Sequence, residues 1–161
     1  MIIIGFQGIG KSSLSRSASN VIDLESGCFW NKHYRSSDWY VYYCQVAIDL
    51  SAQGNVVFTS SHADVRYWLA HTEHHEQIAV CYPSLELKDE WIEKLQARYE
   101  RTKLPKDEKA WARASLCYEA DITELILSPF DEIEIDSMFY DLHQLIRDYQ
   151  EKKFDEADKP F

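Results

Sequence analysis

Basic residues are scarce in this chain. Its 161 residues include 17 Lys and Arg against 27 Asp and Glu, which leaves a formal net charge of -10 at pH 7. A protein that binds nucleic-acid duplexes through their backbone needs a basic surface. We therefore expect no stable nucleic-acid binding, although a local basic pocket for a small anion is compatible with this charge.

Long apolar runs and closely paired cysteines are also lacking. The apolar run at the N-terminus, Met1–Ile4, is far shorter than a signal peptide or a membrane span. The four cysteines stand at positions 28, 44, 81 and 117, and no two form the Cys-x-x-Cys pair of a zinc knuckle or redox motif. We expect free thiols in a reducing compartment, a cytoplasmic protein and no membrane partner.

Glycine is rare as well, and three of the five glycines fall in one short stretch. The stretch reads Gly5-Phe-Gln-Gly-Ile-Gly-Lys-Ser12 and matches G-x-x-x-x-G-K-[ST], with an apolar strand before it and a helical pattern after it. Glycines allow positive φ and a close approach of phosphate to the backbone. Successive backbone N–H groups at a helix N-terminus attract an anion. The motif therefore predicts a nucleotide phosphate site.

Each position of this motif has an expected role. Lys11 can reach the β- and γ-phosphates of ATP and is a candidate catalytic residue, and the Ser12 hydroxyl can ligate Mg²⁺. Gly8, Ile9, Gly10 and Ser13 complete the predicted nucleotide-binding loop, with Ser13 as a helix residue rather than a second metal ligand.

The motifs of a GTPase switch do not follow the loop. Asp23-Leu-Glu-Ser-Gly27 is one residue too long for Asp-x-x-Gly, and Asn31-Lys-His-Tyr34 lacks the Asp of a guanine-binding motif. The strand at residues 55–59 does not end in the acid that a large motor ATPase would need. These features favour a small phosphotransferase.

Strand and helix patterns alternate along the chain. The expected strands are Met1–Gly5, Asn20–Leu24, Asn55–Thr59, Gln77–Tyr82 (closed by Pro83) and Ile133–Asp136. The expected helices are Lys11–Ala18, Asp38–Gln53 with Asp38 as N-cap, Ala63–His71, Leu87–Arg101, Asp107–Leu127 and Met138–Tyr149, followed by a frayed, charged tail. This alternation predicts a single α/β domain over residues 1–161, with a parallel sheet covered by helices on both faces.

Four stretches and the order of elements resemble the small P-loop kinases: nucleoside monophosphate kinases and their relatives that act on shikimate or gluconate. The stretches are GFQGIGKS, VIDLES, VVFTSSHADVRYWL and LQARYERTKLPKDEKAWAR. The VIDLES and SSH patterns further resemble phage and Gram-positive nucleotide kinases. The resemblance covers nearly the whole chain. It implies the three-layer αβα sandwich of P-loop NTPases, a five-stranded parallel sheet of order 2-3-1-4-5, and a helical lid hairpin at about residues 98–113.

The resemblance also implies an activity. ATP and Mg²⁺ would be used to move the γ-phosphoryl group onto a nucleotide, first of all a (deoxy)nucleoside monophosphate. Asp23, at the end of the second strand, would face both the metal and the acceptor, although it also suits a turn cap. Arg98 and Arg101 would be catalytic lid arginines and Arg113 a further phosphate-binding one. The alternative is that they are solvated, although no acid stands three or four residues from any of them.

The acceptor would lie beyond the third strand. Ser61 and His62 are candidates for hydrogen bonds to it, Arg66 for a bidentate phosphate clamp and Tyr40 for stacking on a base. Turn, solvated-helix and core roles are the respective alternatives. We interpret Lys103 and Lys106 as surface charges. The histidines at 71, 74 and 75 are expected in a solvated loop rather than in a zinc site. Trp68 and Trp91 are expected either in the core or at a homodimer interface.

Two other functions stay open. One is a kinase for a nucleoside, another small hydroxylated metabolite or a modified base in DNA, the last of which the acidic charge disfavours. The other is a non-catalytic regulator, which would bind ATP without acceptor-dependent turnover.

Overall fold

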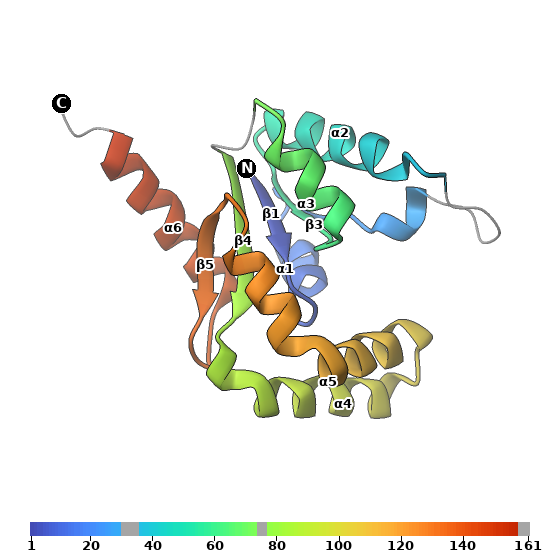
Figure 1. Ribbon diagram of the computed structural model, residues 1–161. Helices are drawn as coiled ribbons and strands as arrows, with labels where there is room; N and C mark the ends of the chain where they lie inside the picture. The colour runs from blue at the N-terminus through green and yellow to red at the C-terminus, as the bar shows by residue number, and fades with distance from the viewer. Residues whose placement is uncertain (30–35, 74–76, 158–161) are drawn as a thin grey trace.

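A computed structural model describes residues 1–29, 36–73 and 77–157. Its strands form one parallel sheet of order β2-β3-β1-β4-β5, as expected (Figure 1). The strands are β1 (Ile2–Gly5), β2 (Val21–Asp23), β3 (Val56–Thr59), β4 (Ile78–Pro83) and β5 (Asp131–Ile135). Every residue of β1, β3 and β4 is buried, because the central strands of a parallel sheet are covered on both faces.

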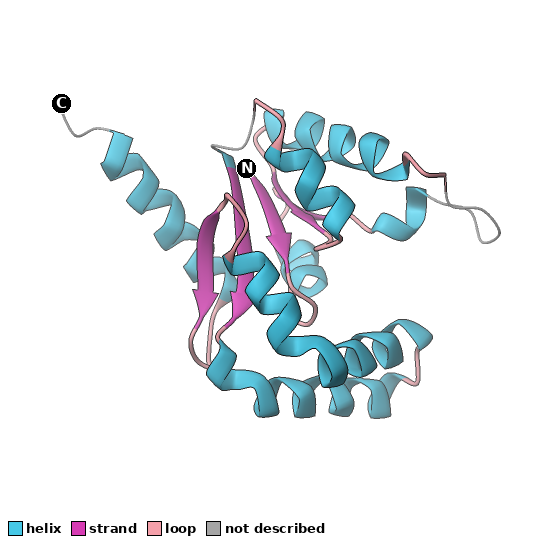
Figure 2. Cartoon of the chain, in the orientation of Figure 1, coloured by secondary structure: helices cyan, strands magenta, loops and turns pink. Residues whose placement is uncertain are grey.

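Helices surround this sheet, with the strands in magenta at the centre of Figure 2. They are α1 (Lys11–Ser17), α2 (Trp39–Ala52), α3 (Ala63–Ala70), α4 (Lys88–Thr102), α5 (Pro105–Ile126) and α6 (Leu142–Ala157), with 3-10 turns η1 (Ser26–Phe29) and η3 (Leu85–Leu87). In Figure 1, α5 crosses in front of the sheet, whereas α1 and the start of α6 lie behind it. Within the described residues, no helix is long and apolar enough to cross a membrane.

Helices α4 and α5 form an antiparallel hairpin that projects from the C-terminal end of β4 (Figure 1). Its turn is only Lys103–Leu104, shorter than the gap between the expected helices Leu87–Arg101 and Asp107–Leu127. Lys103 ends α4 in a left-handed conformation with φ 53°, and Pro105 starts α5. Proline suits the first helical position because its missing N–H would have no helical partner there.

Among the other boundaries, those of α6 and β4 differ from expectation, and Asp38 is the N-cap of α2 as predicted but without the expected side-chain bond. Helix α6 begins at Leu142 and continues to Ala157, so much of the tail expected to fray is helical. Pro83 belongs to β4 and pairs with Ile135, at a strand end where its missing N–H is tolerated. Asp38 precedes α2 without a capping hydrogen bond from its side chain, and instead accepts one from the Ser36 hydroxyl.

Candidate functional site

The loop Gly5–Ser12, here called the glycine-rich loop, turns sharply between β1 and α1. Gly8 and Gly10 have φ of 85° and 100°, which glycine adopts without strain. A Cβ atom on Gly8 would lie 2.8 Å from Cδ2 of Leu95 on α4. The loop therefore needs glycine both for its backbone conformation and for its contact with α4.

Lys11 folds back over this loop. Its Nζ donates a hydrogen bond of 2.9 Å to the carbonyl oxygen of Gly5. Burial lowers the pKa of Lys11, and the nearby carboxylates of Asp23 and Glu25 oppose that effect. A buried ammonium that bonds to a neutral carbonyl is stabilised further when an anion binds beside it.

Ser12 and Asp23 bring two oxygen groups together. The Ser12 hydroxyl donates to Oδ2 of Asp23 at 2.5 Å. The phenol of buried Tyr43 holds the end of β2 in place, since it donates to the Leu24 carbonyl at 2.7 Å and accepts from the Ser60 N–H at 2.8 Å. Hydroxyl and carboxylate oxygens are donors that Mg²⁺ prefers, together with phosphate oxygens. The residues present therefore fit a magnesium ion bound with a phosphorylated ligand.

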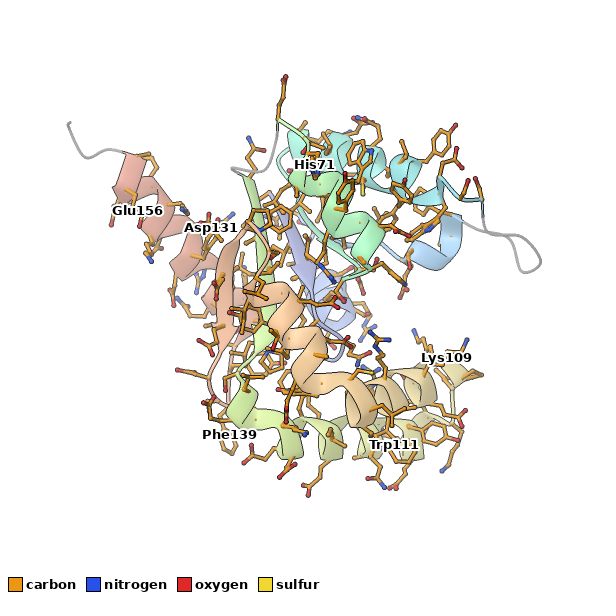
Figure 3. All side chains as sticks on the ribbon, viewed as in Figure 1. His71, Lys109, Trp111, Asp131, Phe139 and Glu156 are labelled. Atoms are coloured by element: carbon orange, nitrogen blue, oxygen red, sulfur yellow. The ribbon has the colours of Figure 1, made fainter. Side chains whose placement is uncertain are left out.

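A cleft of about 750 Å³ opens in front of the loop. Its other walls are the end of β2, η1 and the α4–α5 hairpin, and Figure 3 shows side-chain nitrogens gathered between α1 and that hairpin. Three carboxylates face the cleft: Asp23, Glu25 and Asp107. Six cationic side chains line it: Lys11, Arg16, Lys94, Arg98, Arg101 and Lys106. In a protein with net charge -10, this cleft concentrates positive side chains, an arrangement that favours an anionic ligand.

The hairpin fixes one of these cations firmly. Arg98 Nη2 lies 2.8 Å from Oδ1 of Asp107, whose carboxylate is almost fully buried and also accepts a 2.6 Å hydrogen bond from the Thr102 hydroxyl. Arg98 Nε is buried, with no hydrogen-bond partner in the part of the chain that the structure describes. Arg98 therefore lines the cleft with one buried donor of its guanidinium unsatisfied.

Two aromatic side chains hold the glycine-rich loop from outside. Trp91 of α4 donates its indole N–H to the Gln7 carbonyl at 3.0 Å. Tyr140, from the segment before α6, donates to the Ile9 carbonyl at 2.9 Å. Lys94 Nζ in turn donates to the Tyr140 oxygen at 2.9 Å.

Sequence reasoning missed Lys94 and Tyr140. A signal for the first was present, since Lys94, Arg98 and Arg101 are spaced i, i+4 and i+7 and share one face of a helix. No such signal marked Tyr140, because 131 residues separate it from Ile9.

Most residues predicted for the donor side meet in the cleft. Its lining includes Gly8, Gly10, Lys11, Ser12, Ser13, Asp23, Arg98 and Arg101. Ile9 is fully buried and contributes its carbonyl to Tyr140. Lys106, interpreted as a surface charge, is exposed and also belongs to the residues that line the cleft.

The other predicted residues lie elsewhere. Arg113 makes a bidentate contact with Asp121, at 2.7 and 2.5 Å. The residues predicted to bind the acceptor contact other protein groups. Arg66 bonds to the Ser61 carbonyl and to the Glu124 carboxylate. His62 Nδ1 lies 2.8 Å from the Ser60 hydroxyl, and Tyr40 packs edge-on against Trp39.

Of this acceptor-side segment, Ser60 reaches the cleft lining. Arg113, Arg66, Ser61, His62 and Tyr40 are not among the described residues that line it. Their roles in binding stay predictions. The histidine cluster is only partly described, because His74 and His75 lie outside the described residues.

Comparison with known proteins adds no name to this site. No protein-family model matches the chain, and no curated protein matches its sequence. The function has to be inferred from the chemistry of the cleft.

Proposed function

We propose that this protein is a phosphotransferase of the P-loop kinase type, which uses ATP and Mg²⁺ and moves the γ-phosphoryl group to a nucleotide, first of all a (deoxy)nucleoside monophosphate. The observation that carries this proposal is the convergence of the glycine-rich loop, the Ser12–Asp23 pair and Arg98 and Arg101 on one cleft. The volume of about 750 Å³ lies within the range usual for small-molecule sites.

The cationic residues would act mainly by neutralising charge. Phosphoryl transfer leaves little covalent work for the protein, so positioning and electrostatics dominate. Lys11 would leave the Gly5 carbonyl for the β- and γ-phosphate oxygens, and Arg98 and Arg101 would stabilise charge on the group in transit. Ser12 and Asp23 would hold Mg²⁺, which when bound neutralises phosphate charge.

The hairpin would add a second effect. It forms one wall of the cleft, and Asp107 anchors Arg98 to it. A hairpin that approaches the glycine-rich loop would bring its arginines to the phosphates and exclude water in one motion. Excluding water suppresses hydrolysis of ATP in favour of transfer.

A hydroxyl-bearing acceptor, such as a nucleoside or another hydroxylated metabolite, is the second candidate. The wall opposite α4 carries the carboxylates of Asp23 and Glu25 beside the hydroxyls of Ser26 and Ser60. A carboxylate can accept the proton of an attacking hydroxyl, and serine hydroxyls can orient it. This wall therefore also suits an alcohol as nucleophile.

The test is ADP release from Mg·ATP over a panel of ribo- and deoxynucleoside monophosphates, nucleosides and small hydroxy acids. Turnover with a monophosphate supports the first proposal, and turnover only with a hydroxyl acceptor supports the second. Binding of ATP with only background hydrolysis across the panel would contradict both and leave a nucleotide-binding regulator.

A matched pair of lysine variants ties any turnover to this cleft. We expect Lys11→Ala to lower kcat/KM by about 10²–10³, the usual cost of losing one preorganised charge-stabilising group. Lys109→Ala should leave it unchanged, because Lys109 is exposed and is not among the described cleft residues. Full activity of Lys11→Ala would show that the turnover comes from elsewhere.

A further inference from the structure

Lys94 occupies an unusual position beside the glycine-rich loop. Its Nζ lies 3.9 Å from the centre of the Trp91 ring and 4.9 Å from that of Tyr140. The two rings stack at 21° with their centres 6.0 Å apart. Both rings are hydrogen-bonded to the loop, at the carbonyls of Gln7 and Ile9. The ammonium is therefore held at a defined distance from the loop that would receive the phosphates.

No carboxylate neutralises this ammonium. Across residues 1–29, 36–73 and 77–157, no ion pair involves Lys94. Arg98, one turn further along α4, repels it. The charged and titratable groups that line the cleft together with Lys94 are Arg98 and Arg101 of α4, Tyr140 before α6, Lys11 and Arg16 of α1, Lys106 and Asp107 of α5, and Asp23 and Glu25 on the opposite wall. A half-buried cation among mostly positive neighbours indicates an anionic ligand.

We propose that Lys94 is a further ligand-binding residue of the cleft, which contacts a phosphate group of the bound nucleotide while Trp91 and Tyr140 hold it against the glycine-rich loop. The proposal rests on the proposed function, and it identifies Lys94, Arg98 and Arg101 as one phosphate-binding face of α4. Tyr140 and Trp91 are positioning residues, because they contact the loop and the lysine rather than the ligand.

The contact would make nucleotide affinity depend on pH. Burial, followed by repulsion from Arg98, lowers the pKa of Lys94 to about 8. A phosphate stabilises the charged ammonium, so binding would raise this pKa and take up a proton. The affinity for the nucleotide should be highest well below pH 8 and should fall as the pH rises through about 8. For one titrating group the loss approaches a factor of about 10 per pH unit above its pKa.

The test compares wild type with Lys94→Arg and Lys94→Met, with Mg·AMP-PNP as a non-hydrolysable probe, by calorimetry at pH 7 and pH 9. We expect the affinity of the wild type to fall about tenfold between these values. Lys94→Arg should show a much smaller pH dependence than wild type, because arginine keeps its charge and the lysine with a lowered pKa that remains at the loop is Lys11. Lys94→Met should bind at pH 7 about as weakly as wild type does at pH 9.

A control variant and a second measurement make the test decisive. Lys88→Met should behave as wild type, since Lys88 is exposed on the same helix and pairs with Glu119. In the wild type, NMR titration of lysine ¹³Cε should find Lys94 near pKa 8 in the free protein and well above 9 with Mg·AMP-PNP bound. An unmoved pKa would overturn the proposal even if a Lys94 variant failed to fold.

The outcomes separate the two proposals. Binding of Mg·AMP-PNP with the same pH dependence in all three proteins would overturn the role of Lys94 and leave the nucleotide site intact. No binding to wild type at either pH would overturn both.

Discussion

Two glycines of this chain share a left-handed backbone but differ in their surroundings. Gly8 has φ 85° in the glycine-rich loop, and Gly54 has φ 87° after α2. A Cβ atom at Gly8 would lie 2.8 Å from Leu95 Cδ2 and 3.2 Å from Trp91 Nε1, whereas no described atom lies within 4 Å of the same point at Gly54. Position 54 thus needs only the positive φ, but position 8 also needs the close contact with α4.

This difference predicts unequal costs for the same substitution. Gly54→Ala should lower the free energy of unfolding by about 1–2 kcal/mol, the cost of a left-handed alanine. Gly8→Ala should lose that amount and a further 1–3 kcal/mol or so from overpacking. Urea unfolding measures both values, and ATP binding should be lost only in Gly8→Ala. Equal destabilisation would contradict the contact between the loop and α4.

At the scale of elements, the hairpin divides its arginines between two environments. Arg98 and Arg101 line the cleft, whereas Arg113 pairs with Asp121, eight residues later on α5. Figure 1 shows α5 bent between the hairpin and the part that crosses the sheet. Arg113 is therefore held by a carboxylate of its own helix and is not among the described residues that line the cleft.

We accordingly expect different effects from three glutamine substitutions. Arg98→Gln and Arg101→Gln should each lower kcat by about 10²–10³ while ATP affinity changes less than tenfold, because their charge matters most in the transition state. Arg113→Gln should leave kcat within about threefold, because Arg113 is not among the described residues that line the cleft, although the change removes the partner of the Asp121 side chain, which is 17% exposed. Steady-state kinetics with the acceptor identified in the panel would measure kcat for all three variants. If Arg113→Gln alone abolished transfer, the hairpin would have to rearrange before catalysis.

At the scale of the molecule, ligand binding and folding are coupled. The cleft is formed by the end of β2, α1, α4 and α5, which pack together only in the folded chain. Unfolding disperses its six cations into a chain of net charge -10. A nucleotide should therefore bind the folded state alone and stabilise it by mass action.

Mg·ATP at 100 times its Kd should raise the free energy of unfolding by about 2.7 kcal/mol. For a chain of this size, that corresponds to an increase in Tm of roughly 5–10 °C. Differential scanning calorimetry with and without nucleotide measures the shift, and Lys11→Ala should show almost none. An unchanged Tm in the wild type would contradict a nucleotide site in this cleft.

The local chemistry of the sequence was enough to predict much of this protein. Strand patterns predicted all five strands to within two residues. The apolar runs of β1, β3 and β4 carried the strongest signal, because a strand covered on both faces needs only uninterrupted apolar side chains. The motif around Lys11 and Ser12 predicted the turn of the glycine-rich loop, because glycine at positive φ is a local requirement. The start of α6 was misplaced, although Asp141 marks it, because aspartate is a preferred N-cap residue and its carboxylate accepts hydrogen bonds from the N–H groups of His143 and Gln144.

Tertiary structure alone decided the partners of several charged side chains. Arg66, predicted for an acceptor phosphate, bonds instead to Glu124 on α5, 58 residues away. Lys94 owes its setting to Tyr140, which the sheet and α6 bring back to the loop at Ile9. A charged side chain takes its partner from whatever elements pack beside it. That packing follows from burial of the core as a whole, so the spacing of residues along the chain cannot reveal it.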